Sequence, residues 1–369
     1  MRLRRLGFAV ILLALLGVLT AGLLEVLVRV VDPQILPQDV PDLWVKDPAI
    51  SWRHTANAHM VANTGDRDVE ICTDSEGDRV ACDAPPRAEC AKRILVVGDS
   101  YVEALAVPFE ETVWQRIETD TGACTSVAGV SGYRLSQYLT SERERLGAPG
   151  AHFDLVILAF YVGNDITDDA EKLPPAQDVQ KRPVRLLPAG LSAEALYDWF
   201  YPLNAWLESR SHAYVAVRFA IRRFRDPGDA GLYGVSRALR RSQLTPKFLD
   251  ETVRGVRLVA EVAHQHGARI LVVVIPERPQ VVDPEGARLK RAMPALAGDI
   301  DMDLTSREFV PRLAATPEID RLVDLLPLLR ANPDPANWGE GDGHFSPLGH
   351  ARFYDAIREP VRALLGPSD

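Results

Sequence analysis

Four short polar motifs carry the residue types that acyl-transfer chemistry requires. Together they supply a serine, a glycine, an asparagine and an aspartate–histidine pair: Gly98-Asp99-Ser100, Ser131-Gly132, Gly163-Asn164-Asp165 and Asp342-Gly343-His344. A serine hydroxyl is a weak nucleophile until a base takes its proton, and a carboxylate orients that base. The oxyanion formed on attack needs hydrogen-bond donors, which backbone N–H groups and an asparagine amide can provide. The set predicts a serine nucleophile with its base and oxyanion donors.

Each motif alone is weak evidence, because Gly, Asp, Ser and Asn are common turn residues. Their order is more informative, since each required component occurs once and each follows a different apolar run. Of the eight histidines, only His344 combines an aspartate at close spacing with a position after the last apolar run. We therefore interpret the four motifs as one site.

Five short runs rich in β-branched residues predict the strands that position these motifs, at residues 94–97, 126–130, 154–160, 269–275 and, most weakly, 321–325. Helical patterns separate the runs. The clearest has Thr245 at its N-cap and Gly267 at its end, and a final helix is predicted at about 347–365. This alternation favours a mainly parallel sheet covered on both faces, with ligands bound at the carboxyl ends of the strands.

The four motifs resemble the sequence blocks of the SGNH (GDSL-type) hydrolase superfamily, over residues 93–365. The resemblance implies a flavodoxin-like three-layer α/β/α domain with a mainly parallel five-stranded sheet. It also implies site roles for five residues: Ser100 as nucleophile, His344 as base, Asp342 as the partner of that base, and an oxyanion hole formed by the N–H groups of Ser100 and Gly132 with the side chain of Asn164. No metal or organic cofactor is implied.

The sequence departs from the usual superfamily pattern at three places. Tyr101 replaces a leucine, Ala104 stands where many members have glycine, and the last block is Asp-x-His in place of Asp-x-x-His. The shorter spacing resembles the branch that contains alginate O-acetyltransferase-like proteins and other exported carbohydrate acylation factors. It bears on the role of Asp342 and not on that of His344. We expect the second histidine, His350, to cap or pack the last helix.

The N-terminus predicts export. Met1 to Arg5 contains three arginines, and Leu6 to Leu24 then runs for 19 residues without a charge. As a helix this segment would span about 28 Å, close to the hydrocarbon thickness of a bilayer. The basic start favours an N-terminus held inside and a catalytic domain outside the cytoplasm. A cleaved signal peptide is the alternative, with Thr20-Ala21-Gly22 as a weak cleavage site.

Four cysteines, Cys72, Cys82, Cys90 and Cys124, agree with export, because an even number allows two disulfides. Three pairings are open, and free buried cysteines are the alternative. A zinc site is disfavoured because the spacings are wide and no Cys-x-x-Cys occurs.

Composition divides the chain into regions. We predict a membrane anchor or signal peptide at 1–31, a linker and small cysteine-containing accessory segment at 32–92, and a hydrolase domain at 93–369. A helical insertion at about 170–244 carries clustered aromatic residues and arginines. Packing within the insertion is its simplest role, and contact with substrate or with the membrane interface is the alternative.

The net charge of −9 disfavours a general nucleic-acid binder, because nothing offsets phosphate repulsion. The sequence thus predicts a membrane-anchored, extracytoplasmic serine esterase that acts on small acyl esters, with acylated carbohydrate among its candidate substrates. One alternative keeps the same residues in an O-acetyltransferase of a cell-surface polysaccharide. Another is a non-catalytic glycan-binding or assembly subunit on the same fold, which the intact set of motifs disfavours.

Overall fold

The computed structural model of the protein divides into two units. One comprises Met1–Asp39 with Lys181–Asp229, and the other comprises Val40–Gln180 with Ala230–Asp369. The structure describes residues 2–366, except for 35, 37–41, 65–66, 84–89, 168, 174–198, 201–202, 205, 226–234 and 340–342.

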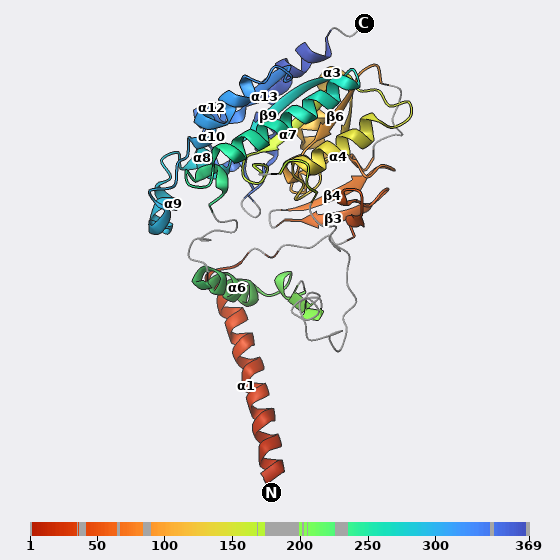
Figure 1. Ribbon diagram of the computed structural model, residues 1–369. Coiled ribbons are helices and arrows are strands. Elements are labelled where there is room, and N and C mark those ends of the chain that lie inside the picture. The colour runs from red at the N-terminus through yellow and green to blue at the C-terminus, as the bar shows by residue number, and fades with distance from the viewer. Residues whose placement is uncertain are drawn as a thin grey trace. The chain divides into compact units, whose positions relative to one another are not determined.

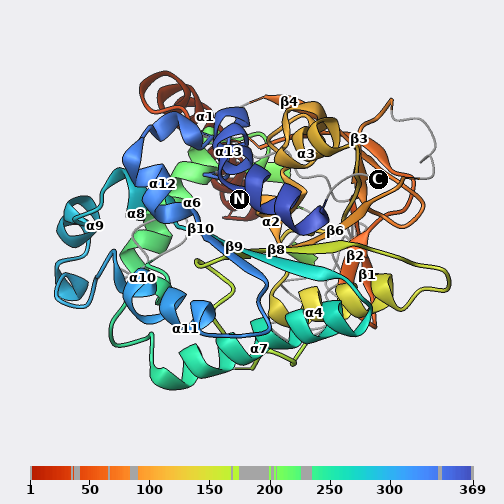
Figure 2. The same ribbon diagram turned by 90° about the horizontal axis from the view of Figure 1, so that it is seen from above.

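A five-stranded parallel sheet forms the centre of the larger unit (Figure 2). Its strands, in chain order, are β6 (Arg93–Val97), β7 (Cys124–Val127), β8 (Leu155–Tyr161), β9 (Arg269–Ile275) and β10 (Arg321–Asp324). Their spatial order is β10-β9-β8-β6-β7, which is the doubly wound order of flavodoxin-like folds. The predicted fold class is therefore confirmed. The second strand ends at Val127, earlier than the apolar run suggested, although the N–H groups of Ala128 and Val130 still bond to the neighbouring segment.

Side chains alternate between the two faces of the sheet, and each face has its own apolar core. Leu95 and Val97 of β6 face a core that includes α4 (Leu135–Leu146) and α7 (Pro246–Gln265). Ile94 and Val96 face the opposite core, which includes α3 (Val113–Thr121), α12 (Leu325–Ala331) and α13 (Pro347–Leu365). Helices thus cover both faces, as parallel strands buried on both sides require (Figure 2).

Short helices complete the larger unit around these layers: α2 (Ser100–Glu103), α8 (Arg278–Val282), α9 (Ala287–Ala292), α10 (Leu304–Glu308) and α11 (Val310–Ala314), with single 3₁₀ turns at Phe109–Glu111, Arg237–Leu239, Pro294–Leu296 and Pro335–Asn337. Two of the predicted helices agree closely with α7 and α13. Thr245 is the N-cap of α7, but its side chain makes no capping hydrogen bond.

The accessory segment consists of two small antiparallel sheets. A hairpin pairs β1 (Trp44–Asp47) with β2 (Ser51–His54), and a three-stranded sheet orders β3 (His59–Asn63), β4 (Asp68–Thr73) and β5 (Arg79–Val80). Two disulfides close this region, Cys72–Cys82 and Cys90–Cys124. The second joins the segment before β6 to the first residue of β7, so it ties the accessory segment to the central sheet.

The smaller unit contains α1 (Arg2–Val31) and α6 (His212–Arg225), which contact each other (Figure 1). Within α1, Ile11–Val31 has a mean hydropathy of 2.6 and is not buried against the rest of the chain. This helix is long and apolar enough to cross a membrane, and a signal sequence would meet the same criterion.

Candidate active site

Ser100 begins α2 directly after β6, at the carboxyl end of a central strand. Asp99 is the N-cap of α2, and its Oδ1 accepts a hydrogen bond from the Tyr101 N–H at 2.9 Å. Two glycines allow α2 to lie close to the strand ends. A Cβ on Gly98 or Gly129 would come within 2.3 Å of the side chain of Val102, which is fully buried. The position of Ser100 therefore depends on Gly98 and Gly129, because any other residue at either position would displace Val102 and with it α2.

His344 lies next to Ser100, although 244 residues separate the two in sequence. Its Nε2 lies 2.7 Å from Ser100 Oγ, a hydrogen-bond distance for a base and its nucleophile. The ring of Tyr101 packs 5.1 Å from that of His344, centroid to centroid, and supports it from one side. Asp342, predicted as the partner of His344, lies outside the described residues, so its role stays a prediction.

The two other predicted oxyanion donors follow β7 and β8, the strands on either side of β6. Asn164 Nδ2 donates to Asp99 Oδ2 at 2.8 Å, which leaves the second N–H of the amide to donate elsewhere. Gly132 has φ +79°, in the left-handed region that favours glycine. The structure brings both residues to the same edge of the sheet as Ser100, and their role as oxyanion donors stays a prediction.

Two buried aspartates support this edge of the sheet. Burial raises the pKa of Asp99, against hydrogen bonds from Tyr101 and Asn164 and the attraction of His344. Burial likewise holds the pKa of Asp165 well above its usual value. Asp165 accepts from the Tyr161 N–H and the Tyr138 hydroxyl, both at 2.8 Å, and thereby closes the turn that carries Asn164.

Sequence reasoning missed two buried glutamates. Glu103, three residues after Ser100, is 0% exposed and accepts hydrogen bonds from Trp44, His54 and Ser131. Glu277 follows β9, accepts a hydrogen bond from the Ser236 hydroxyl, and has its pKa raised to about 7 by burial. For Glu277 the available signal was a charged residue two positions after a predicted buried strand, whereas no local feature marked Glu103.

The second histidine of the last motif, His350, is buried. Burial lowers the pKa of His350 to about 3, so the ring is neutral near neutral pH. Its Nδ1 accepts from the Val113 N–H at 3.3 Å, which joins the first turn of α13 to α3.

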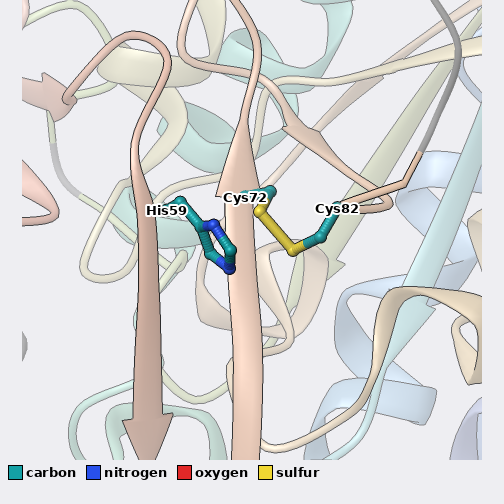
Figure 3. A group of neighbouring side chains, drawn as sticks. All are labelled: His59, Cys72 and Cys82. Atoms are coloured by element: carbon teal, nitrogen blue, oxygen red, sulfur yellow. A yellow bond between two sulfur atoms is a disulfide. The ribbon is translucent and has the colours of Figure 1, made fainter.

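Among the residues that the structure describes, one group of side chains has the composition of a metal site. His59, Cys72 and Cys82 bring their nitrogen and sulfur atoms within 4.8 Å of one another. Figure 3 shows that the two sulfurs are bonded to each other in the Cys72–Cys82 disulfide. A disulfide sulfur is no thiolate, so this group lacks the ligands that zinc prefers.

Comparison with known proteins yields matches among solved structures. No protein-family model matches the sequence, and no curated protein matches it. The chain is similar to the structure of TesA, at 14% identity and a TM-score of 0.35, over 74% of this chain and 99% of that chain. It is also similar to a catalytic mutant of Axe2, an acetylxylan esterase from Geobacillus stearothermophilus, at 12% identity and a TM-score of 0.38, over 77% of this chain and 100% of the other. A lipase/acylhydrolase from Enterococcus faecalis matches at 12% identity and a TM-score of 0.35, over 75% and 99% of the two chains.

Proposed function

We propose that this chain is an SGNH-type serine hydrolase that cleaves acyl esters through an acyl-enzyme on Ser100. The observation that carries the proposal is the 2.7 Å contact between Ser100 Oγ and His344 Nε2 at the carboxyl edge of a parallel sheet. The nucleophile–base pair of acyl transfer has this geometry on unrelated folds, which supports the same roles for Ser100 and His344. Asn164 and Gly132, at the same edge, support the proposal because the reaction also needs oxyanion donors.

The chemistry follows from these positions. His344 Nε2 takes the proton of Ser100, and Oγ bonds to the ester carbonyl carbon. The carbonyl oxygen becomes an oxyanion beside the N–H groups of Ser100 and Gly132 and the amide of Asn164. The ester C–O bond then breaks, His344 returns the proton to the departing alkoxide, and the acyl group stays on Ser100. Water, deprotonated by His344, releases the acid by the same steps.

The proposed substrates are small acyl esters, including O-acetyl groups on carbohydrate. The Asp-x-His spacing of the last motif supports this class through its resemblance to exported carbohydrate acylation factors. The same acyl-enzyme would serve a transferase if a sugar hydroxyl, in place of water, accepted the acyl group. We further propose that α1 is retained as an anchor and holds the larger unit outside the cytoplasm, as the apolar helix and two disulfides suggest.

Substitution of the pair tests the proposal. Ser100→Ala and His344→Ala should each abolish turnover of a short acyl ester by the full-length protein, and the double variant should be scarcely worse, because the two residues act together. His152→Ala is a matched control, since His152 is exposed and lies 3.7 Å from the carboxylate of Asp154, before β8. Equal ester hydrolysis by parent and Ser100→Ala would refute the proposal.

Labelling separates a serine hydrolase from a binding protein. A serine-directed phosphonate should modify Ser100 in the parent and in His152→Ala, and modify it much more slowly in His344→Ala. A folded parent that neither reacts with the phosphonate nor hydrolyses any ester would favour a non-catalytic subunit. Recovery of acylated sugar when an acceptor is added would favour the transferase.

A further inference from the structure

Glu103 lies where three parts of the larger unit meet: α2 (the nucleophile helix), the loop that carries Ser131 and Gly132, and the accessory segment. It is the last residue of α2, and its carboxylate is completely buried. Burial alone would raise the pKa of Glu103, but hydrogen bonds from His54, Ser131 and Trp44 outweigh it and hold the pKa below the usual value. A buried carboxylate that stays ionised needs such a set of donors.

Two of these donors belong to the β1–β2 hairpin. Trp44 Nε1 donates to Glu103 Oε1 at 2.9 Å, and His54 Nε2 lies 2.6 Å from the same oxygen. His54 Nδ1 lies 3.0 Å from the Gly77 carbonyl oxygen. Both ring nitrogens of His54 therefore face oxygen atoms, one on the turn between β4 and β5 and one on the nucleophile helix α2. The hairpin and the nucleophile helix are thus joined by two buried side-chain contacts, Trp44–Glu103 and His54–Glu103.

The third donor is Ser131, whose hydroxyl bonds to the other carboxylate oxygen, Glu103 Oε2. A third residue of the hairpin, Trp52, holds the loop that carries Ser131, because Trp52 Nε1 donates to the Ser131 carbonyl oxygen at 3.1 Å. That carbonyl shares a rigid, planar peptide unit with the Gly132 N–H, which points the opposite way. Fixing the Ser131 oxygen therefore fixes the direction of the Gly132 N–H.

The end of α2 is held from the same segment. The buried guanidinium of Arg79, on β5, donates to the carbonyl oxygens of Glu103, Ala104 and Val107. Ala104 has φ +53°, the left-handed conformation in which many superfamily members carry glycine. These bonds hold the helix end in a conformation that alanine disfavours.

We propose that Trp52 and Glu103 are positioning residues that aim the Gly132 N–H at the oxyanion, so that the accessory segment completes the active site. This inference rests on the proposed function, because it gives Gly132 its role in stabilising the tetrahedral intermediate. Neither residue touches the reacting atoms. Both act through the Ser131–Gly132 peptide, one on its carbonyl oxygen and the other on the side chain of Ser131.

The test compares Trp52→Phe, Glu103→Gln and Ser131→Ala with the parent, as full-length proteins. Trp52→Phe keeps the aromatic ring and removes only the N–H donor. Complete loss of one oxyanion donor costs about 10²–10³ in turnover, so a misdirected donor should lower kcat by about 10- to 100-fold. The KM should change little, because the oxyanion exists only after attack. Binding of a boronic acid that forms a tetrahedral adduct with Ser100 should weaken by a similar factor.

Glu142→Gln is the matched control, since Glu142 is another fully buried acid, lies on α4, and has a carboxylate that hydrogen-bonds to none of the described residues. It should leave kcat and boronate affinity unchanged even if it changes stability. A kcat within about twofold of the parent in both Trp52→Phe and Glu103→Gln, while Ser100→Ala is inactive, would overturn this inference and leave the proposed function standing. A parent without Ser100-dependent turnover, in contrast, would refute the proposed function itself.

A separate observation concerns the smaller unit, in which the chain at the start of α6 is hydrogen-bonded to Glu25 and Arg29 of α1. The Glu25 carboxylate accepts hydrogen bonds from Ser211 Oγ at 2.7 Å and from the N–H groups of His212 and Ala213 at 3.1 and 3.0 Å. Arg29 also donates to the Arg210 carbonyl oxygen. Glu25 directly follows the uncharged run Leu6 to Leu24, so α6 begins at the level where that run ends.

The residues around this junction expose apolar side chains. Val217 and Ile221, one turn apart on α6, are 44% and 52% exposed, and Leu203 and Trp206 before it are 47% and 53% exposed. Tryptophan and leucine next to a membrane-length helix are typical of the bilayer interface. We infer that this face of the insertion lies in the membrane–water interface and takes lipid as its partner.

Lipid quenching tests this inference on the full-length chain in vesicles that contain nitroxide-labelled lipid. The described cysteines are all paired, so a cysteine introduced by substitution can carry a fluorophore selectively. A fluorophore at Ile221→Cys should be quenched strongly. One at Val61→Cys, an equally exposed apolar position on β3 of the larger unit, should not be quenched.

A third label, at Leu16→Cys, reports on the anchor. Quenching at residue 16 but not at residue 221 would overturn the interfacial surface and keep the anchor. Equal quenching at 221 and 61 would likewise overturn it. Loss of residue 16 from the mature protein would overturn the anchor and, with it, the surface that adjoins it.

Discussion

The close packing of α2 against Gly98 allows a sharp test of how the fold places Ser100. A Cβ added at Gly98 would lie 2.3 Å from Val102 Cγ2, 3.3 Å from Val102 Cβ and 3.0 Å from the Ala159 carbonyl oxygen. Gly98→Ala must therefore displace Val102, and overpacking of this kind costs about 1–3 kcal/mol of unfolding free energy. Because Ser100 begins the same short helix, the displacement should also lengthen its 2.7 Å contact with His344 and lower kcat.

A double-mutant cycle isolates this clash. Val102→Ala removes both γ-methyl groups and should by itself cost about 2 kcal/mol through lost burial and a small cavity. In the Val102→Ala protein, the nearest side-chain atom to the new Cβ is the Cβ of residue 102, at 3.3 Å. Gly98→Ala should therefore cost about 1 kcal/mol less unfolding free energy there than in the parent.

Urea denaturation followed by tryptophan fluorescence measures the four free energies, and initial rates on a short ester measure kcat. Gly298→Ala is the control, because a Cβ there would meet nothing within 4 Å. Additive costs of the two substitutions, or a Gly98→Ala protein as stable as the Gly298→Ala control, would refute the packing argument.

Three further predictions follow from the structure. Asn164→Ala should fold and lose about 10²–10³ in turnover; full turnover in steady-state kinetics would remove Asn164 from the oxyanion hole. Reduction should raise the intact mass of the parent by about 4 Da, and that of a variant with Cys90 and Cys124 replaced by serine by about 2 Da. The same replacement should cost about 4 kcal/mol in unfolding free energy, because the bridge spans 34 residues. An unchanged urea midpoint would contradict this. The pKa of Glu277 is raised from 4.5 to about 7, so its protonated form stabilises the fold below about pH 4.5, and that contribution, about 3 kcal/mol, is lost as the pH rises through 7. Glu277→Gln should therefore flatten the fall in stability between pH 4.5 and 8, and an unchanged pH profile of the urea midpoint would exclude Glu277 as its source.

Much of the sheet was predictable because its determinants are local. Strands buried on both faces need runs of apolar, β-branched residues, and the runs at 94–97, 154–160 and 269–275 agree with β6, β8 and β9 to within a residue. The order of the motifs then placed Ser100 and Asn164 at strand ends on one edge of the sheet, since parallel strands present their carboxyl ends at one edge. The predicted strand at 126–130 extends past the end of β7, because its apolar residues continue beyond the paired strand into the loop that packs against α2.

The disulfide pairing lay beyond local patterns. Four cysteines allow three pairings, and only the register of β4 against β5 and of β6 against β7 brings Cys72 to Cys82 and Cys90 to Cys124. Likewise, α6 belongs to the same unit as α1 because Glu25 bonds to residues 186 to 188 positions further along the chain.

The sequence by itself determined which residue types stand at the strand ends, and the tertiary structure alone decided how they are aimed. Glu103 has no local feature that separates it from a surface glutamate. Its burial depends on Trp44 and His54, which are 59 and 49 residues away in sequence, and on Ser131 in the following loop. An ionised carboxylate is stable in the interior only where hydrogen-bond donors surround it. Here those donors come from distant segments, so local sequence cannot predict the burial of Glu103.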